Sequence, residues 1–289
     1  MTLVRILREN DRNTSYCAEW QDKDIFLKDI RTDLTPSEEY QIWQRYRKVS
    51  KDMIPQCLFF DDDKKQIAYE WLSGYAPIND GYSQENLDLI LQFLKKNALV
   101  NSYKKLCAND VIVQCSRKKR RAQINTFLSY ADKAVRLFVE QGYDFPFSGF
   151  LLSLSYFCYE ETLCHCDMGR SNILWNGKSI KLVDYEYSMF SRKELDYGRL
   201  YSTVFLLMRD GVLDNSTYEK LSLQIVERNK INCEYFSKLA GLQLLMRLVN
   251  NFEAKKQVDT VQLNLINKLL SENKVSKNTL LNIIFFPNT

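Results

Sequence analysis

The first seventy residues consist of short apolar runs separated by short polar turns. Each run is rich in the β-branched and aromatic residues that favour strands. An acidic turn, Asp61-Asp62-Asp63, joins the last two runs. The pattern therefore predicts a five-stranded sheet with strands at 3–9, 15–21, 24–30, 57–60 and 65–72.

One helix is expected between the third and the fourth of these strands. Thr35 is suited to the N-cap, Pro36 fits the first helical position, and Glu38 completes a capping box. Because Glu38 is used by the cap, Glu39 is the acidic residue left to face the core. It shares a helix face with three apolar residues at i+3, i+4 and i+7, which are Ile42, Trp43 and Tyr46.

After the segment 73–82 the apolar spacing changes to about 3.6 residues, the period of an amphipathic helix. Helical patterns cover 83–99, 123–143 and 194–211, and helices continue towards the end of the chain. We therefore predict an α+β fold with two lobes. Residues 1–72 form a small five-stranded antiparallel lobe with one helix, and residues 73–289 form a larger, mainly helical lobe. A cleft between two such lobes is a favoured ligand site.

The amino-acid composition excludes several classes of site. The 289 residues carry a formal net charge of +4 and include one histidine, so a zinc site that needs two histidines is excluded. The sequence has no G-x-S-x-G motif for a hydrolase. The eight cysteines include no C-x-x-C pair, and the N-terminus does not resemble a signal peptide, so we expect reduced thiols and a cytoplasmic location. The longest apolar stretch, 145–159, is too short to span a bilayer.

The segment "HCDMGRSNILWNGKSIKLVDYEYS" (165–188) concentrates the polar residues that point to chemistry. Asn176-Gly177 is a strong signal for a two-residue type I′ hairpin turn. Such a hairpin brings Asn172, before its first strand, close to Asp184, after its second. Both side chains offer the oxygen atoms that Mg²⁺ prefers. Asp167 lies in the preceding loop, where a carboxylate can accept the proton of a reacting hydroxyl.

This segment resembles the catalytic segment of the choline/ethanolamine kinase and aminoglycoside phosphotransferase superfamily. The resemblance consists of H-x-D-x-x-x-x-N, a hairpin, and a hydrophobic residue followed by Asp, an aromatic residue and Glu. It rests on His165, Asp167, Asn172 and Asp184. It implies a bilobal protein-kinase-like fold that uses ATP and Mg²⁺ to phosphorylate an alcohol. Asp167 is then the catalytic residue, Asn172 and Asp184 are the metal ligands, and His165 is structural.

The resemblance also implies roles in the first lobe. A lysine of the third strand should hold the ATP phosphates and pair with a helix glutamate. The candidates are Lys28 and Glu39. The family's hinge, whose backbone meets adenine, corresponds to Glu70, Trp71 and Leu72. The turn 9–16 has no glycine, so the donors over the phosphates are expected to be Asn13, Thr14 and Ser15.

Three further polar residues lie near the motif. Two of them have two interpretations each, and the third is interpreted as structural. Arg170 either touches the γ-phosphate or is a surface charge. Glu186 is either a second carboxylate near the metal or a surface residue. Asp196 matches a family aspartate that braces the catalytic loop, and we interpret it as structural.

The sequence leaves several classes of acceptor molecule open. "VDYEYS" (183–188) most resembles the choline/ethanolamine kinases, so an amino alcohol is the first candidate acceptor. A sugar, a lipopolysaccharide core or an aminoglycoside is the alternative, and a catalytically inactive kinase-like binding module is a further one. The basic run 116–121 is interpreted as a solvated helix face rather than a membrane contact through 117–121, and no nucleic-acid partner is expected.

Overall fold

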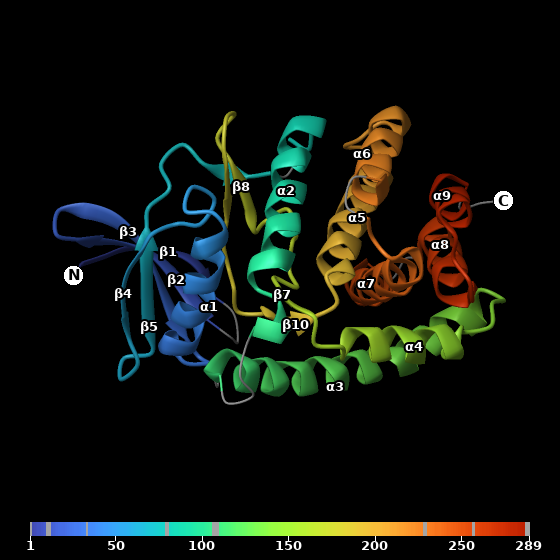
Figure 1. Cartoon of the computed structure of the whole chain (residues 1–289), viewed down its shortest axis with the longest axis horizontal. Coiled ribbons are helices and arrows are strands. Elements are labelled where there is room, and N and C mark those ends of the chain that lie inside the picture. The colour runs from blue at the N-terminus through green and yellow to red at the C-terminus, as the bar shows by residue number, and fades with distance from the viewer. Residues whose placement is uncertain are drawn as a thin grey trace.

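The computed structural model describes residues 2–9, 13–32, 34–78, 81–105, 110–227, 230–255 and 258–286. A sheet with one helix lies at one end of the molecule and helices occupy the rest (Figure 1). We call these the sheet part, which is β1 to β5 with α1, and the helical part, which is α2 to α9 with five short strands. Within the described residues, no helix is long and apolar enough to cross a membrane. The predicted α+β architecture is confirmed.

Five antiparallel strands form the sheet in the order β1-β2-β3-β5-β4. Lys28 lies opposite Ile67, so the two side chains share a face. Lys28 contacts Glu39 of α1, and Ile67 belongs to the same buried cluster as Ile42 of that helix, so this face is the one covered by α1. The five strands of this sheet are β1 (Thr2–Glu9), β2 (Asn13–Trp20), β3 (Lys23–Ile30), β4 (Cys57–Asp61) and β5 (Gln66–Glu70).

Helix α1 (Pro36–Val49) begins as the capping box predicts. The Thr35 hydroxyl accepts a hydrogen bond from the Glu38 amide at 3.2 Å, and the Glu38 carboxylate accepts one from the Thr35 amide at 2.8 Å. Glu39 is on the buried face of the helix and is 1% exposed. The cap therefore sets the register that turns Glu39 towards Lys28.

The helical part is built around α5 (Glu194–Arg209), which is buried along most of its length and packs against α6 and α7. The other helices are α2 (Gln84–Val100), α3 (Val111–Glu140), α4 (Phe147–Phe157), α6 (Asn215–Glu227), α7 (Cys233–Lys255), α8 (Thr260–Ser271) and α9 (Lys277–Phe285), with a 3₁₀ turn at Tyr103–Lys105. The short strands are β6 (Ala76–Pro77), β7 (Thr162–Cys164), β8 (Ile173–Trp175), β9 (Ile180–Leu182) and β10 (Met189–Ser191).

Helix α3 begins twelve residues earlier than the 123–143 pattern predicts, and it includes the basic run. Asp110 caps it by accepting a hydrogen bond from the Ile112 amide at 2.9 Å. Arg120 donates to the Phe190 carbonyl at 2.7 Å and to Glu160 at 2.8 Å. Part of the basic run therefore attaches α3 to β10 and is not simply a solvated face.

Strands β8 and β9 form the predicted hairpin with a different turn. A type I′ turn requires positive φ at both central residues. Gly177 has a φ of +89°, whereas Asn176 is not among the residues with positive φ. Instead, the Asn176 side chain accepts hydrogen bonds from the Lys178 and Ser179 amides and closes a loop over 176–179. The two-residue turn was the wrong prediction, although the hairpin still joins the two halves of the motif.

Candidate active site

A cavity of about 480 Å³ lies between the sheet part and the helical part. This volume is within the range of sites for small molecules. The three predicted hinge residues, Glu70, Trp71 and Leu72, line it. Polar residues from both parts also line it, and they include Asn13, Ser15, Lys28, Glu39, Asn172 and Asp184.

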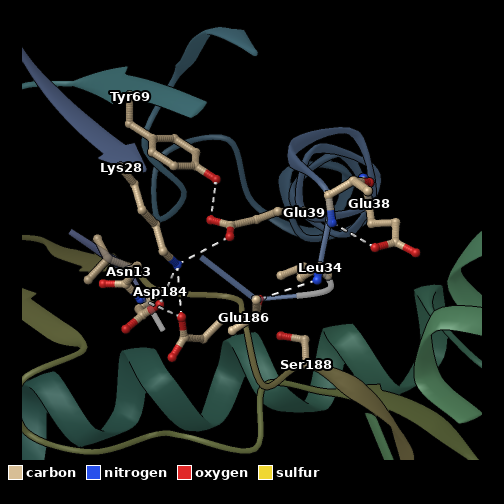
Figure 2. A network of polar contacts seen from close by, with 12 residues as sticks. Asn13, Lys28, Leu34, Glu38, Glu39, Tyr69, Asp184, Glu186 and Ser188 are labelled. Atoms are coloured by element: carbon tan, nitrogen blue, oxygen red, sulfur yellow. Dashed lines mark hydrogen bonds and ion pairs between the residues drawn. The ribbon is translucent and has the colours of Figure 1, made fainter. Parts of the chain in front are cut away.

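Lys28 is a buried cation among three carboxylates, as Figure 2 shows. Its Nζ atom lies 3.0 Å from Asp184 and 3.2 Å from both Glu39 and Glu186. Burial alone would lower the pKa of Lys28, but the acidic groups raise that pKa well above its ordinary value. The side chain is therefore a fixed positive charge that joins β3, α1 and the loop after β9.

Glu39 is held in place from a second side. The Tyr69 hydroxyl of β5 donates to Glu39 Oε1 at 2.9 Å, while Lys28 binds Oε2 (Figure 2). Both oxygens thus have a partner, and the carboxylate can compensate the lysine without turning away.

The pKa values of the two carboxylates after β9 are shifted in opposite directions. Burial would raise the pKa of Asp184, but the Lys28 ammonium outweighs it and lowers that pKa below its ordinary value. For Glu186, burial prevails and the pKa is raised. Asp184 is therefore the carboxylate that stays ionised and available for a cation.

The loop between β7 and β8 is held in place by Asp196 at the start of α5. Asp196 accepts hydrogen bonds from the backbone amides of His165 at 2.9 Å and Cys166 at 2.8 Å. The Nε2 atom of His165 lies 3.1 Å from the Val183 carbonyl oxygen, which links the loop to the strand before Asp184. These contacts give His165 and Asp196 the structural positions that the sequence suggested.

Two non-glycine residues beside the site have left-handed backbones. Cys166 and Asp184 each have a φ of +66°. Such conformations cost energy for residues with a Cβ, and they concentrate where a side chain must be aimed in one direction. Asp184 is aimed at Lys28 in this way.

Asp167 is oriented by two neighbours. The Asn172 side-chain amide donates to Asp167 Oδ2 at 2.8 Å, and Arg199 donates to Oδ1 at 2.5 Å. The remaining lone pairs of the carboxylate are available to a ligand, and its side chain is 25% exposed. Asp167 is thus positioned to accept a proton.

The donor set beside the cavity fits a hard cation. Asn172 uses its amide nitrogen on Asp167, so its amide oxygen is the atom available to a metal, and it accepts only a hydrogen bond from Ser171 at 3.2 Å. Asp184 adds an ionised carboxylate. In the described part of the chain, no group of three or more His, Cys, Asp or Glu side chains could hold a metal by itself. Mg²⁺ is commonly bound by one or two carboxylates together with phosphates, so the residues present fit it.

Asn13, Thr14 and Ser15, predicted to lie in the turn over the phosphates, are instead the first three residues of β2 and have different surroundings. Asn13 donates to Glu186 at 2.7 Å, and Ser15 lines the cavity. Thr14 is buried and its hydroxyl has no hydrogen-bond partner among the described residues. Arg170 is exposed in the catalytic loop. Residues 10–12 of the predicted 9–16 turn lie outside the described residues.

Two arginines next to Asp167 were missed from the sequence. Arg199 is on α5 and Arg247 is on α7, far from the motif in the chain. The available signal was an arginine inside an apolar helical run, as in "LLMRLV" (244–249).

Comparison of the sequence with protein-family models and with curated proteins finds no match. Solved structures, in contrast, match nearly the whole chain. A choline/ethanolamine kinase family protein from Mesorhizobium loti has a TM-score of 0.55 and 14% identity, covering 98% of this chain and 93% of that one. Choline kinase LicA from Streptococcus pneumoniae has a TM-score of 0.56 and 12% identity, covering 94% of each chain.

A third match is a spectinomycin phosphotransferase in complex with ADP and spectinomycin. Its TM-score is 0.55 and its identity 13%, over 98% of this chain and 92% of that one. The catalytic motif predicted a resemblance to these proteins, and the structural comparison confirms it at the level of the fold. The chain therefore has the kinase-like fold of the choline/ethanolamine kinases and the aminoglycoside phosphotransferases.

Proposed function

We propose that this protein is a magnesium-dependent phosphotransferase that moves the γ-phosphate of ATP to a hydroxyl of a small molecule. The observation that carries the proposal is buried Lys28 bound by Glu39 and Asp184, beside a loop that orients Asp167. A buried ion cluster of this kind adds little to fold stability compared with apolar packing. Ionisable side chains with shifted pKa values in a cavity are, however, typical of functional sites.

Each residue then has a role that follows from its position. Lys28 binds the α- and β-phosphates, and Glu39 keeps it extended towards them. Asn172 and Asp184 hold Mg²⁺, which neutralises negative charge on the phosphates when it is bound. The adenine contacts the backbone of residues 70–72, which also mark the boundary that we propose between lobes 1–72 and 73–289.

The reaction is a displacement at phosphorus. The acceptor hydroxyl oxygen forms a bond to the γ-phosphorus, the bond from that phosphorus to the bridging oxygen breaks, and ADP leaves with the electron pair. Asp167 accepts the hydroxyl proton. Asn172 and Arg199 hold the carboxylate in the orientation that this transfer needs.

The chemical class of the acceptor is a separate question from the phosphotransfer itself. The neighbours include proteins named as choline kinases and as a spectinomycin phosphotransferase, so their names support an alcohol acceptor without choosing one. The amino-alcohol acceptor suggested by "VDYEYS" stays a prediction. The sugar or lipopolysaccharide-core alternative agrees better with the arginines around Asp167.

Substitution of the proposed base tests the proposal. In an ATP-consumption assay with amino alcohols, aminoglycosides and sugars as acceptors, we expect acceptor-dependent turnover that falls at least about 10²-fold in Asp167→Asn. The fold should be retained by circular dichroism, because asparagine keeps an oxygen that accepts from Arg199. Asp132→Asn, an exposed change on α3, is the matched control and should leave turnover unchanged.

The alternative of an inactive kinase-like binding module makes the opposite prediction. It expects nucleotide binding without acceptor-dependent turnover in the wild type. Full turnover by Asp167→Asn would also contradict the role given to this carboxylate.

A further inference from the structure

The side of Asp167 that faces the helical part carries an excess of positive charge. Arg199 of α5 binds Asp167 directly, and Arg247 of α7 comes close to the same place. A methyl group on Gly169 would lie 3.6 Å from Arg199 Nη2, 3.7 Å from Asp167 Oδ1 and 3.8 Å from Arg247 Nη2. These are ordinary van der Waals distances, so both guanidinium groups and the Asp167 carboxylate lie around Gly169.

Arg247 lacks the partners that buried cations usually have, and Arg199 has them only in part. Arg247 is half-buried and makes no hydrogen bond or ion pair with the described residues. Arg199 is 8% exposed, and its Nε is buried without a hydrogen-bond partner there. Burial and the charge of Arg199 lower the pKa of Arg247 to about 10, so the side chain is still charged at neutral pH.

Two more groups contribute to the same environment. Arg170 of the catalytic loop acts electrostatically on Arg247, while Asp167 is the carboxylate that compensates it. Tyr82, which precedes α2, is influenced by both Arg199 and Arg170 and has a buried hydroxyl without a partner in the described structure. Arg247 thus has two other guanidinium groups and one carboxylate in its electrostatic surroundings, and the Tyr82 hydroxyl is near two of these guanidinium groups.

This cluster is separate from the cavity assigned to the nucleotide. The lining of that cavity includes Asn172 and Asp184 but none of Asp167, Arg199 and Arg247. If the nucleotide occupies that cavity, the acceptor must reach Asp167 from outside it, where Arg199 and Arg247 lie. A positively charged acceptor would be repelled there, whereas the paired N–H groups of arginine match the oxygens of a phosphate or a carboxylate.

We propose that the acceptor is an alcohol that carries an anionic substituent, a phosphate or a carboxylate, which Arg199 and Arg247 bind so that its hydroxyl meets Asp167. This inference rests on the proposed phosphotransferase function. It makes Arg247 a determinant of specificity that contacts the substrate away from the reacting atoms.

Matched acceptor pairs test the proposal. We would measure kcat/KM with Mg·ATP for two pairs, glycerol with glycerol 3-phosphate and glucose with glucose 6-phosphate, and for the two cationic acceptors choline and ethanolamine. The wild type should prefer the anionic member of a pair. Arg247→Gln should raise the KM for that acceptor roughly 10- to 100-fold, the value of a lost charged hydrogen bond, and leave the KM for ATP unchanged. Arg247→Lys should recover part of the loss, and Arg136→Gln, at an exposed ion pair on α3, is the control.

A binding measurement separates this inference from the proposed function. With Mg²⁺ and the ATP analogue AMP-PNP present, inorganic sulfate should raise the Tm of the wild type and of Arg136→Gln by more than that of Arg247→Gln, because the general stabilisation by sulfate is common to all three. An Arg247-dependent rise in a protein that turns over no acceptor would overturn the proposed function and keep the anion site. Preference for choline or for the neutral acceptors, absence of any Arg247-dependent effect of sulfate, or a rise in the KM for ATP in Arg247→Gln would overturn the inference.

Discussion

Two charge clusters of opposite composition meet at the catalytic loop. On the side of the cavity, one ammonium group, Lys28, lies within 3.2 Å of three carboxylates. On the side of the helical part, one carboxylate, Asp167, binds Arg199 and has Arg247 nearby. The first cluster has an excess of negative charge, which suits a metal cation bound with its nucleotide. The second has an excess of positive charge, which suits an anionic acceptor.

The clusters also differ in how the fold holds them. Lys28 joins β3, α1 and the loop after β9, so the first cluster connects the sheet part to the helical part (Figure 2). Arg199 and Arg247 lie on α5 and α7, which pack together within the helical part. Changes to the first cluster should therefore affect stability as well as activity, whereas changes to the second should act mainly on the acceptor.

The largest effect is expected from Lys28→Met. This change leaves Glu39 buried without its cation and removes the group that we propose binds the phosphates. Breaking a buried ion pair on one side costs about 3 kcal/mol or more, so the free energy of unfolding should fall by about that amount and ATP turnover should be lost. Urea denaturation and the ATP-consumption assay would measure these changes.

Lys23→Met, an exposed change on the same strand, is the control for Lys28→Met and should change neither quantity. A Lys28→Met protein with wild-type stability and turnover would remove the distinction between the two clusters.

A smaller effect is expected from Asp196→Asn, which acts beneath the catalytic loop that both clusters share. Asparagine has one acceptor oxygen for the two backbone amides that Asp196 binds, so one of them loses its partner. The free energy of unfolding should fall by about 2 kcal/mol, and kcat should fall because Asp167 is displaced. Stopped assays at saturating ATP would measure kcat, with Asp210→Asn at the exposed end of α5 as the control. An unchanged kcat would mean that the hydrogen bonds of Asp196 to the loop do not position Asp167.

The smallest effect concerns pH. Because the pKa of Asp184 is lowered in the folded protein, its contribution to stability is present above its unfolded pKa of about 3.9 and is lost as the pH falls through the lower folded value. Wild type should exceed Asp184→Asn in free energy of unfolding by on the order of 1 kcal/mol near neutral pH. This difference should begin to fall near pH 4 and disappear once the pH is below the folded pKa of Asp184. A difference that does not change with pH would mean that Asp184 is not an ionised partner of Lys28.

Most of the fold and the first cluster could be predicted from local sequence patterns. The capping box fixes the start of α1, and the helical period then puts Glu39 on the buried face, so one short segment contains the necessary information. The hairpin likewise connects Asn172 to Asp184 over a few residues, although the Asn176 side chain changes the turn.

The second cluster could not be predicted in this way, because it depends on contacts between distant helices. Arg199 and Arg247 are 48 residues apart, and only the packing of α5 against α7 brings both to Gly169. Neither arginine belongs to a local motif. Similarly, the sequence did not show that Arg120 would bind the backbone of β10.

The central claim is that the first cluster binds Mg·ATP, and isothermal titration calorimetry tests it most directly. We predict that ATP binds the wild type in the presence of Mg²⁺, that removal of Mg²⁺ with EDTA weakens binding, and that Asp184→Asn weakens it similarly. No heat of binding when Mg·ATP is titrated into folded wild-type protein would contradict the account.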